Sequence, residues 1–251
     1  MIAVMVIATG GWAMKATAGD VVVRKAGDRG RADFGWLDSR HTFSFGDYYD
    51  PKHMGFRTLR VINEDRVAGD GGFPEHPHRD MEIFSYVLEG KLSHKDSMGN
   101  GRVLEPGQIQ LMSAGTGVTH SEFNPSESIG AHFLQVWIQP RERGLKPSYT
   151  EWHPKPQLES APKVLVISSD GREGSATIHQ DADVYRIRLK AGDGVTHDLA
   201  AGRGIWLQVM QGSMKINGLD LAEGDGASSE HAGIYRIEAT TGAQALLFDL
   251  K

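Results

Sequence analysis

The chain has 251 residues, enough for one large domain or two modest domains that each bury a core. Hydrophobic residues make up 39% of it, and 31 glycines and 10 prolines indicate a globular protein rich in turns. A formal charge of −5 argues against nucleic acid or an acidic membrane surface as the main partner. Because cysteine is absent, disulfides, zinc–thiolate sites and thiol nucleophiles are excluded, and any metal must be bound by histidine and carboxylate side chains.

The first 19 residues are interpreted as an N-terminal extension. Residues 2–8 are apolar, but they are too few to span a membrane and lack the basic flank of a secretory signal. Residues 16–18 imitate a signal cleavage site, yet an upstream extension before a native start at Met14 is the simpler account. We therefore expect a cytoplasmic protein whose residues 1–13 are dispensable and whose folded part begins at Asp20.

From residue 20 onward, short runs of β-branched and aromatic residues alternate with glycine-containing turns. Such runs fall at residues 21–23, 58–62, 83–88, 109–112, 133–138, 185–189, 205–210 and 245–250. Many short strands at close spacing, with few helical periods, predict an all-β barrel or jelly roll.

Two short phrases in the first half place metal-capable side chains one residue apart. They are His76-Pro77-His78 and His120-Ser121-Glu122. On a β-strand, residues i and i+2 point to the same face, so each phrase can direct both side chains into one cavity. Three imidazoles and one carboxylate suit a divalent first-row metal with open positions, as in non-haem iron sites. The pattern indicates a metal-dependent enzyme.

The other histidines stand alone in the sequence. An isolated histidine is more often a packed or surface residue than a ligand, so we expect structural roles for them. They are His41, His53, His94, His132, His153, His179, His197 and His231.

The middle of the chain interrupts the strand pattern. Five prolines lie between residues 140 and 162, and proline removes a ladder donor and fixes φ. We therefore expect residues 140–162 to be a proline-rich linker rather than sheet interior. It would join a metal-binding domain at residues 20–139 to a second β-domain at residues 163–251.

A weak internal repeat supports two domains of similar fold. Residues 86–92 resemble residues 208–214, and each segment precedes a further glycine turn, at Gly107 and Gly224 respectively. In the first half the candidate ligands lie at fixed distances before Gly90 and after Gly107. The same distances before Gly212 and after Gly224 lead to Asp198, Ala200, Ile237 and Ala239. Only one of these can bind a metal, so the second domain is predicted to be a degenerate copy without metal.

Longer motifs carry a family resemblance. Residues 76–82, 88–90, 94–99 and 110–122 closely resemble the pirin family of the cupin superfamily, and the similarity extends to residues 35–45 and 178–183. The resemblance implies a bicupin, in which two antiparallel jelly rolls pack face to face with metal in the N-terminal one. The family's ligand positions match His76, His78, His120 and Glu122. Glu82 lies where many cupins have a ligating glutamate, and we expect it to be a reserve ligand or a partner behind the ligands.

The resemblance to bacterial pirin-like quercetin 2,3-dioxygenases also implies an activity. One divalent metal per chain, with Fe(II) favoured and Ni, Cu, Zn or Mn able to replace it, would bind a flavonol and O2 in a ring opening that releases CO. Glu122 would take the proton of the substrate's 3-hydroxyl. Two alternatives remain open at this point: a redox-responsive regulator that acts through protein partners, and a non-catalytic small-molecule-binding cupin.

Overall fold

The computed structural model describes residue 17 and residues 20–251. The predicted extension therefore lies outside the described residues apart from Thr17, as does the prediction that residues 1–13 are dispensable. Between residues 21 and 251 the helical elements are one α-helix, α1 (Pro156–Glu159), and two 3-10 turns, η2 (Ala26–Asp28) and η3 (Arg172–Gly174). Among the described residues, no helix is long and apolar enough to cross a membrane. The prediction of an all-β fold is confirmed.

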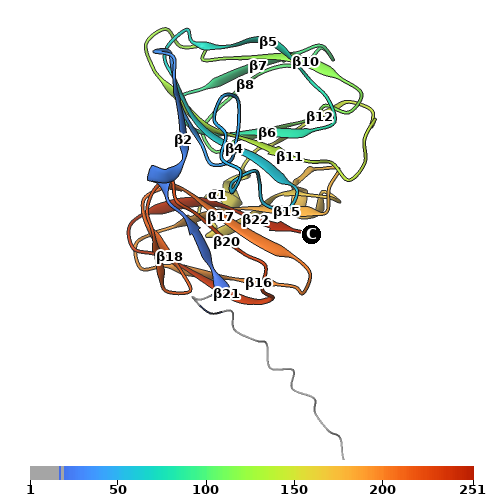
Figure 1. Cartoon of the computed structure of the whole chain (residues 1–251). Helices are drawn as coiled ribbons and strands as arrows, with labels where there is room; N and C mark the ends of the chain where they lie inside the picture. The colour runs from blue at the N-terminus through green and yellow to red at the C-terminus, as the bar shows by residue number, and fades with distance from the viewer. Residues whose placement is uncertain (1–16, 18–19) are drawn as a thin grey trace, which may run out of the picture.

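Each half of the chain forms a sandwich of a seven-stranded and a four-stranded sheet (Figure 1). The larger N-terminal sheet has the order β12 (Ser148–Trp152), β9 (Ile109–Ser113), β6 (Glu82–Glu89), β11 (Ala131–Ile138), β4 (Leu59–Val67), β3 (Leu37–His41) and β2 (Gly30–Asp33). The smaller has the order β5 (Gly72–His78), β10 (Val118–Phe123), β7 (Leu92–Asp96) and β8 (Gly101–Leu104).

The C-terminal sandwich repeats this plan. Its larger sheet has the order β1 (Val22–Arg24), β20 (Gly226–Ser229), β17 (Gly204–Gln211), β22 (Ala243–Leu250), β15 (Ala182–Leu189), β13 (Lys163–Ser168) and β14 (Ala176–Thr177). Its smaller sheet has the order β16 (Gly194–Leu199), β21 (Gly233–Ala239), β18 (Met214–Ile216) and β19 (Leu219–Leu221). The matching sheet sizes agree with the weak sequence repeat.

The two seven-stranded sheets face each other and the four-stranded sheets lie outside, which gives four layers (Figure 1). Strand alternation explains this packing. In β6, Phe84 and Tyr86 join an apolar core that also contains Phe248 of the other sandwich, whereas Val87 faces the core of its own sandwich. Because both faces of β6 are covered, the strand reads as a nearly continuous hydrophobic run.

Two strands cross the predicted division of the chain. β1 belongs to the C-terminal sheet, where it pairs with β20, although it was placed in the domain at residues 20–139. β12 lies within the proline-rich segment and pairs with β9 at the edge of the N-terminal sheet. Pro147 precedes β12 and Pro154 follows it, so the strand itself contains no proline. Its backbone N–H groups are therefore available for pairing. The boundaries at residues 140 and 163 remain a prediction.

The segment between β1 and β2 is anchored to both sandwiches. Asp225 accepts hydrogen bonds of 2.8 Å from Lys25 Nζ and from the backbone N–H of Ala26. Arg29 donates to Glu64 of β4 at 2.8 Å, and His132 Nε2 lies 3.0 Å from the same carboxylate. Burial alone would raise the pKa of Glu64, but the hydrogen bond from His132 and the charge of Arg29 lower it to about 2.

We expect the replacement Glu64→Gln to destabilise the fold. A depressed pKa means that the carboxylate's contribution is complete above its unfolded pKa near 4.5 and is lost as the pH falls to about 2. The variant should lose about 1–3 kcal/mol of unfolding free energy at pH 7, and the difference from wild type should shrink toward pH 2. Urea unfolding at several pH values measures this. Glu105→Gln, which removes an exposed ion pair with Lys91, is the control; equal midpoints for the two variants at pH 7 would contradict the account.

Candidate metal centre

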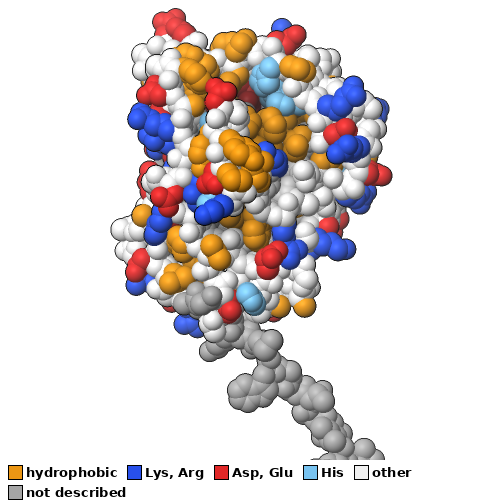
Figure 2. Space-filling view, in the orientation of Figure 1, with side chains coloured by type: hydrophobic (Ala, Val, Ile, Leu, Met, Phe, Trp, Pro, Cys, Tyr) orange, Lys and Arg blue, Asp and Glu red, His pale blue; other side chains and the backbone are white. Residues whose placement is uncertain are grey.

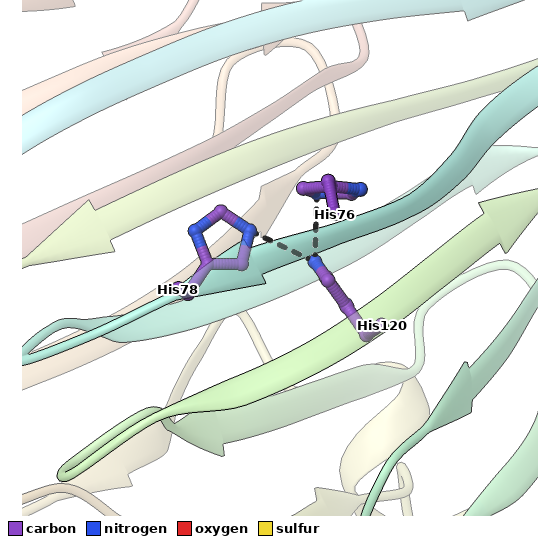
Figure 3. A group of neighbouring side chains, drawn as sticks. All are labelled: His76, His78 and His120. Atoms are coloured by element: carbon purple, nitrogen blue, oxygen red, sulfur yellow. Dashed lines mark hydrogen bonds between the residues drawn. The ribbon is translucent and has the colours of Figure 1, made fainter.

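Three histidines converge from two adjacent strands (Figure 3). In the antiparallel pair of β5 and β10, His76 lies opposite His120 and His78 lies opposite Val118. The Nε2 atom of His120 is 3.0 Å from Nε2 of His78 and 3.0 Å from Nε2 of His76. Nitrogen atoms bound about 2.1 Å from one metal at right angles lie about 3 Å apart, so the spacing fits a shared ion.

A bulge in β5 shapes this cluster. The register shifts so that Glu122 pairs with Phe73 while His120 pairs with His76, which leaves an extra residue in β5 near Pro74. Proline is tolerated at such a bulge because no ladder donor is needed there. The shift changes the alternation, and Phe73, His76 and His78 all line the same cavity.

The imidazoles of His78 and His120 are neutral at pH 7. Burial, followed by the neighbouring histidines, lowers the pKa of His78 and of His120 to about 3. His76 Nδ1 lies 2.8 Å from the carbonyl oxygen of Pro74, and a carbonyl only accepts, so this nitrogen carries the proton. In this tautomer Nε2 is the nitrogen that has the lone pair, and it faces the cluster, as metal binding requires.

Glu122 is fully buried, like His120, whereas His76 and His78 are partly exposed. Its Oε1 accepts hydrogen bonds from Ser85 Oγ at 2.9 Å and Gln110 Nε2 at 2.8 Å, and its Oε2 accepts one from Gln135 Nε2 at 2.6 Å. Its carboxylate forms a group with His94 and His120 in which the possible ligand atoms lie within 4.8 Å of one another. His76, His78 and His120 form the other group, so the two groups have His120 in common.

His94 was expected to have only a structural role, but it lies against the cluster. On β7 it pairs with Glu122 in the ladder, and its Nδ1 is 3.3 Å from Nδ1 of His120. A signal was present in the sequence, because His94 and Asp96 are spaced i and i+2 like the two metal phrases.

Glu82 is not part of the cluster, so its interpretation as a reserve ligand or partner of the ligands is wrong. It accepts a hydrogen bond of 2.6 Å from Ser113 and another of 3.2 Å from the backbone N–H of His179. Its position four residues after His78 does not bring it to the cluster, because the chain turns at residues 79–81 and passes from the smaller sheet to the larger one. On β6, Glu82 shares the face of Phe84, which is directed toward the C-terminal sandwich.

The cluster opens into a cavity of about 760 Å³. Its sides are aromatic: the ring of Trp137 lies 4.8 Å from that of His78 and 5.3 Å from that of Phe45. Figure 2 shows histidine and hydrophobic side chains gathered around a hollow in the upper part of the molecule. Asn63 and Asp65 of β4 form a buried polar part of the lining.

The position of Asp65 disfavours the ionised form of its carboxyl group. Burial raises the pKa of Asp65 to about 7; a hydrogen bond with Ser39 opposes the shift, and the charges of Glu122 and Glu64 add to it. An ionised Asp65 therefore disfavours the folded state.

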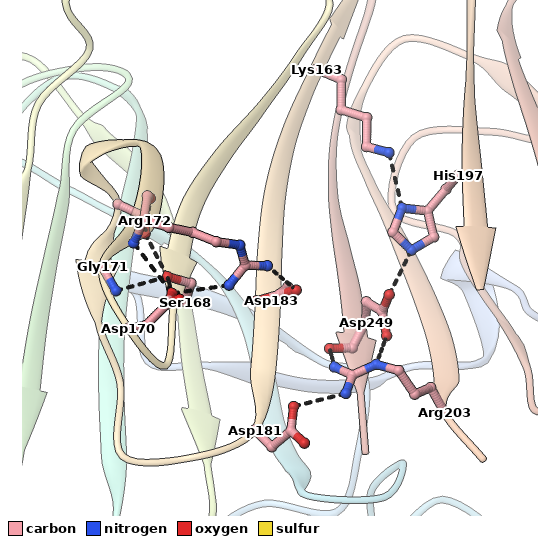
Figure 4. Close-up of polar contacts among 11 residues, drawn as sticks. Lys163, Ser168, Asp170, Gly171, Arg172, Asp181, Asp183, His197, Arg203 and Asp249 are labelled. Atoms are coloured by element: carbon pink, nitrogen blue, oxygen red, sulfur yellow. Dashed lines mark hydrogen bonds and ion pairs between the residues drawn. The ribbon is translucent and has the colours of Figure 1, made fainter. Parts of the chain in front are cut away.

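In the C-terminal sandwich, His197 of β16 belongs to a network without a histidine cluster (Figure 4). His197 connects Lys163 Nζ, 2.9 Å from its Nδ1, to Asp249, 2.8 Å from its Nε2, and Arg203 contacts the same Asp249. Both groups of possible metal ligands among the described residues lie in the N-terminal sandwich. The expectation of one metal per chain remains a prediction.

Two facing antiparallel sandwiches, one with a converging histidine cluster, define a metal-binding protein of the bicupin type. Residues 20–138 match the Pirin family model, and residues 165–250 match the Quercetinase C-terminal cupin domain. The chain belongs to the pirin family, as the sequence motifs predicted.

Known relatives cover nearly the whole chain. It is 46% identical over 231 residues to the Quercetin 2,3-dioxygenase of Escherichia coli K12, which spans 92% of this chain and 98% of that protein. It is 38% identical over 232 residues to a Pirin-like protein of Caulobacter vibrioides, across 91% of this chain and 99% of that one. The crystal structure of the bacterial pirin YhhW from E. coli in complex with nickel(II) has a TM-score of 0.87, at 46% identity over 92% of this chain and 98% of that one.

We expect Asp65→Asn to stabilise the metal-free protein at alkaline pH. Because the folded pKa of about 7 lies above the usual 3.8, the contribution of Asp65 is most favourable below pH 4 and is lost as the pH rises through 7. Relative to wild type, the variant should gain about 2.5 kcal/mol of unfolding free energy between pH 5 and pH 8. Urea titrations at both pH values measure the gain; a gain that does not grow with pH would contradict the assignment.

Proposed function

We propose that this chain is a metal-dependent dioxygenase that opens the heterocycle of flavonols such as quercetin with O2 and releases CO. The observation that carries the proposal is the three-imidazole cluster, two of whose rings, His76 and His78, line an aromatic-walled cavity of about 760 Å³. Small-molecule sites typically occupy about 300–1,000 Å³, so a three-ring flavonol fits this space. The name of the E. coli relative, Quercetin 2,3-dioxygenase, supports the substrate class.

His76, His78, His120 and Glu122 would hold one divalent metal per chain. Neutral imidazoles and a carboxylate suit several first-row metals, and the nickel(II) complex of the E. coli pirin supports a divalent ion. We favour Fe(II), because a nitrogen and oxygen donor set with open positions is typical of non-haem iron oxygenases, although nickel, copper or zinc can compete for it. The metal would supply Lewis-acid and redox chemistry beside the substrate's 3-hydroxyl.

Glu122 is proposed to bind the metal and to remove the proton of the 3-hydroxyl. An ionised carboxylate oxygen can accept two hydrogen bonds, and Oε1 already accepts two, from Ser85 and Gln110. Oε2 accepts one, from Gln135, and keeps one acceptor position, which could serve the metal and the proton in turn but not at the same time. The three donors fix the carboxylate, and removal of the proton leaves an electron-rich flavonolate that can react with O2.

The aromatic walls would orient the substrate and exclude water. Trp137 and Phe45 meet edge to face beside His78, and Phe73 lies edge to face with Trp36 on the other side of the cluster. Flat rings pack well against such faces, and exclusion of water by the bound substrate would strengthen the attraction between the flavonolate and a bound metal ion.

The direct test is turnover by protein loaded anaerobically with Fe(II). Addition of quercetin and O2 should consume both and release CO. If no flavonol gives an oxygen-dependent product, the dioxygenase proposal is wrong, and the regulatory and binding alternatives should then be tested by searching for redox-dependent protein partners.

Glu122→Gln should remove most of the activity. The amide keeps the shape of the side chain but cannot accept the 3-hydroxyl proton, and general-base contributions are commonly about 10²–10⁴-fold. We expect at least about a hundredfold lower turnover at equal metal content, and bound quercetin should lack the red-shifted absorption of its anion. Glu142→Gln, which changes an exposed carboxylate, is the control. Normal turnover by metal-loaded Glu122→Gln would show that Glu122 is not the base.

A further inference from the structure

Behind the histidine cluster, a buried imidazole and a buried carboxylate extend the line of contacts. His94 and Asp96 lie on β7, next to β10, and both side chains are fully buried. His94 Nδ1 is 3.3 Å from His120 Nδ1, and His94 Nε2 is 3.2 Å from Asp96 Oδ2. Asp96, His94 and His120 are therefore connected by two successive hydrogen-bond contacts.

The chemistry of these groups fixes the direction of each hydrogen bond. Ionised Asp96 has no proton to donate, so Nε2–H of His94 donates to it. A neutral ring protonated on Nε2 has its lone pair on Nδ1, and this atom can accept Nδ1–H of His120. His120 then has its lone pair on Nε2, the atom that faces His76 and His78.

Asp96 and His94 are themselves held in place. Asp96 Oδ1 accepts the backbone N–H groups of Met98 at 2.9 Å and Asn100 at 3.0 Å, and Oδ2 accepts Asn100 Nδ2 at 2.8 Å. Burial acts to raise the pKa of Asp96, but the hydrogen bonds from Asn100 outweigh it and the pKa is lowered, which keeps the carboxylate ionised. The ring of Tyr149 on β12 stacks on His94 with centroids 5.2 Å apart.

We propose that His94 and Asp96 are positioning residues that hold His120 in the tautomer and orientation required for metal binding. This inference rests on the proposed role of His120 as a ligand. A His120 ring with its proton on Nε2 would have no lone pair for the ion, and the contact with His94 disfavours that tautomer. Mutation of a residue that hydrogen-bonds to a metal ligand commonly lowers metal affinity by about 10–100-fold.

Zinc affinity, measured by competition with a chromophoric chelator at pH 7.5, tests the inference without catalysis. His94→Ala should bind Zn(II) about 10–100-fold more weakly than wild type. His94→Asn should recover part of the loss, because its amide oxygen can occupy the position of Nδ1 and accept from His120. His153→Ala, which removes an exposed histidine paired with Glu151, should leave the affinity unchanged. Wild-type affinity in His94→Ala would overturn the inference.

A second measurement is independent of whether the variants fold. In Zn(II)-loaded wild type with ¹⁵N-labelled histidine, long-range proton–nitrogen spectra should show His94 protonated on Nε2 and His120 protonated on Nδ1. A His94 ring protonated on Nδ1 would contradict the proposed directions of the hydrogen bonds from His120 to His94 and from His94 to Asp96.

His120→Ala separates this inference from the proposed function. If that variant keeps its zinc, the ligand assignment itself fails. If it loses the zinc while His94→Ala does not, only the positioning role fails.

Discussion

The antiparallel register of β5 against β10 is the constraint on which the site depends. It places His76 opposite His120, and the bulge near Pro74 brings Phe73 to the same cavity as the histidines. A shift of one residue would direct every side chain of a strand to the opposite face and separate the nitrogen atoms. This strand pair belongs to the outer four-stranded sheet, which packs against the larger sheet of the same sandwich. The larger sheet supports it from behind.

The alternation of side chains in the larger sheet joins folding to function. Along β6 and β11, one face contributes Phe84 and Leu134 to the core between the sandwiches. The other face contributes Ser85 and Gln135, which hold the carboxylate of Glu122. The same strands therefore attach the C-terminal sandwich to the N-terminal one and fix the buried carboxylate of the site. This arrangement explains why polar residues lie within otherwise hydrophobic strands.

The sequence predicted the fold class and the histidine cluster because both rest on local patterns with period two. It failed for Glu82 because a turn carries the chain into another sheet, and strand parity cannot be followed through a turn. It overlooked His94, because that residue meets His120 only through the pairing of β7 with β10. The sequence also did not predict strand β12, because it is only five residues long and lies between prolines. The stacking of Tyr149 on His94 could therefore not be foreseen.

The central claim is that three imidazoles of the N-terminal sandwich share one metal ion. X-ray absorption at the iron edge of Fe(II)-loaded protein, combined with metal analysis, tests it most directly. The account predicts one iron per chain, with scattering from three imidazole rings and the remaining ligands oxygen. Two ions per chain, or fewer than three imidazoles at the iron, would contradict it.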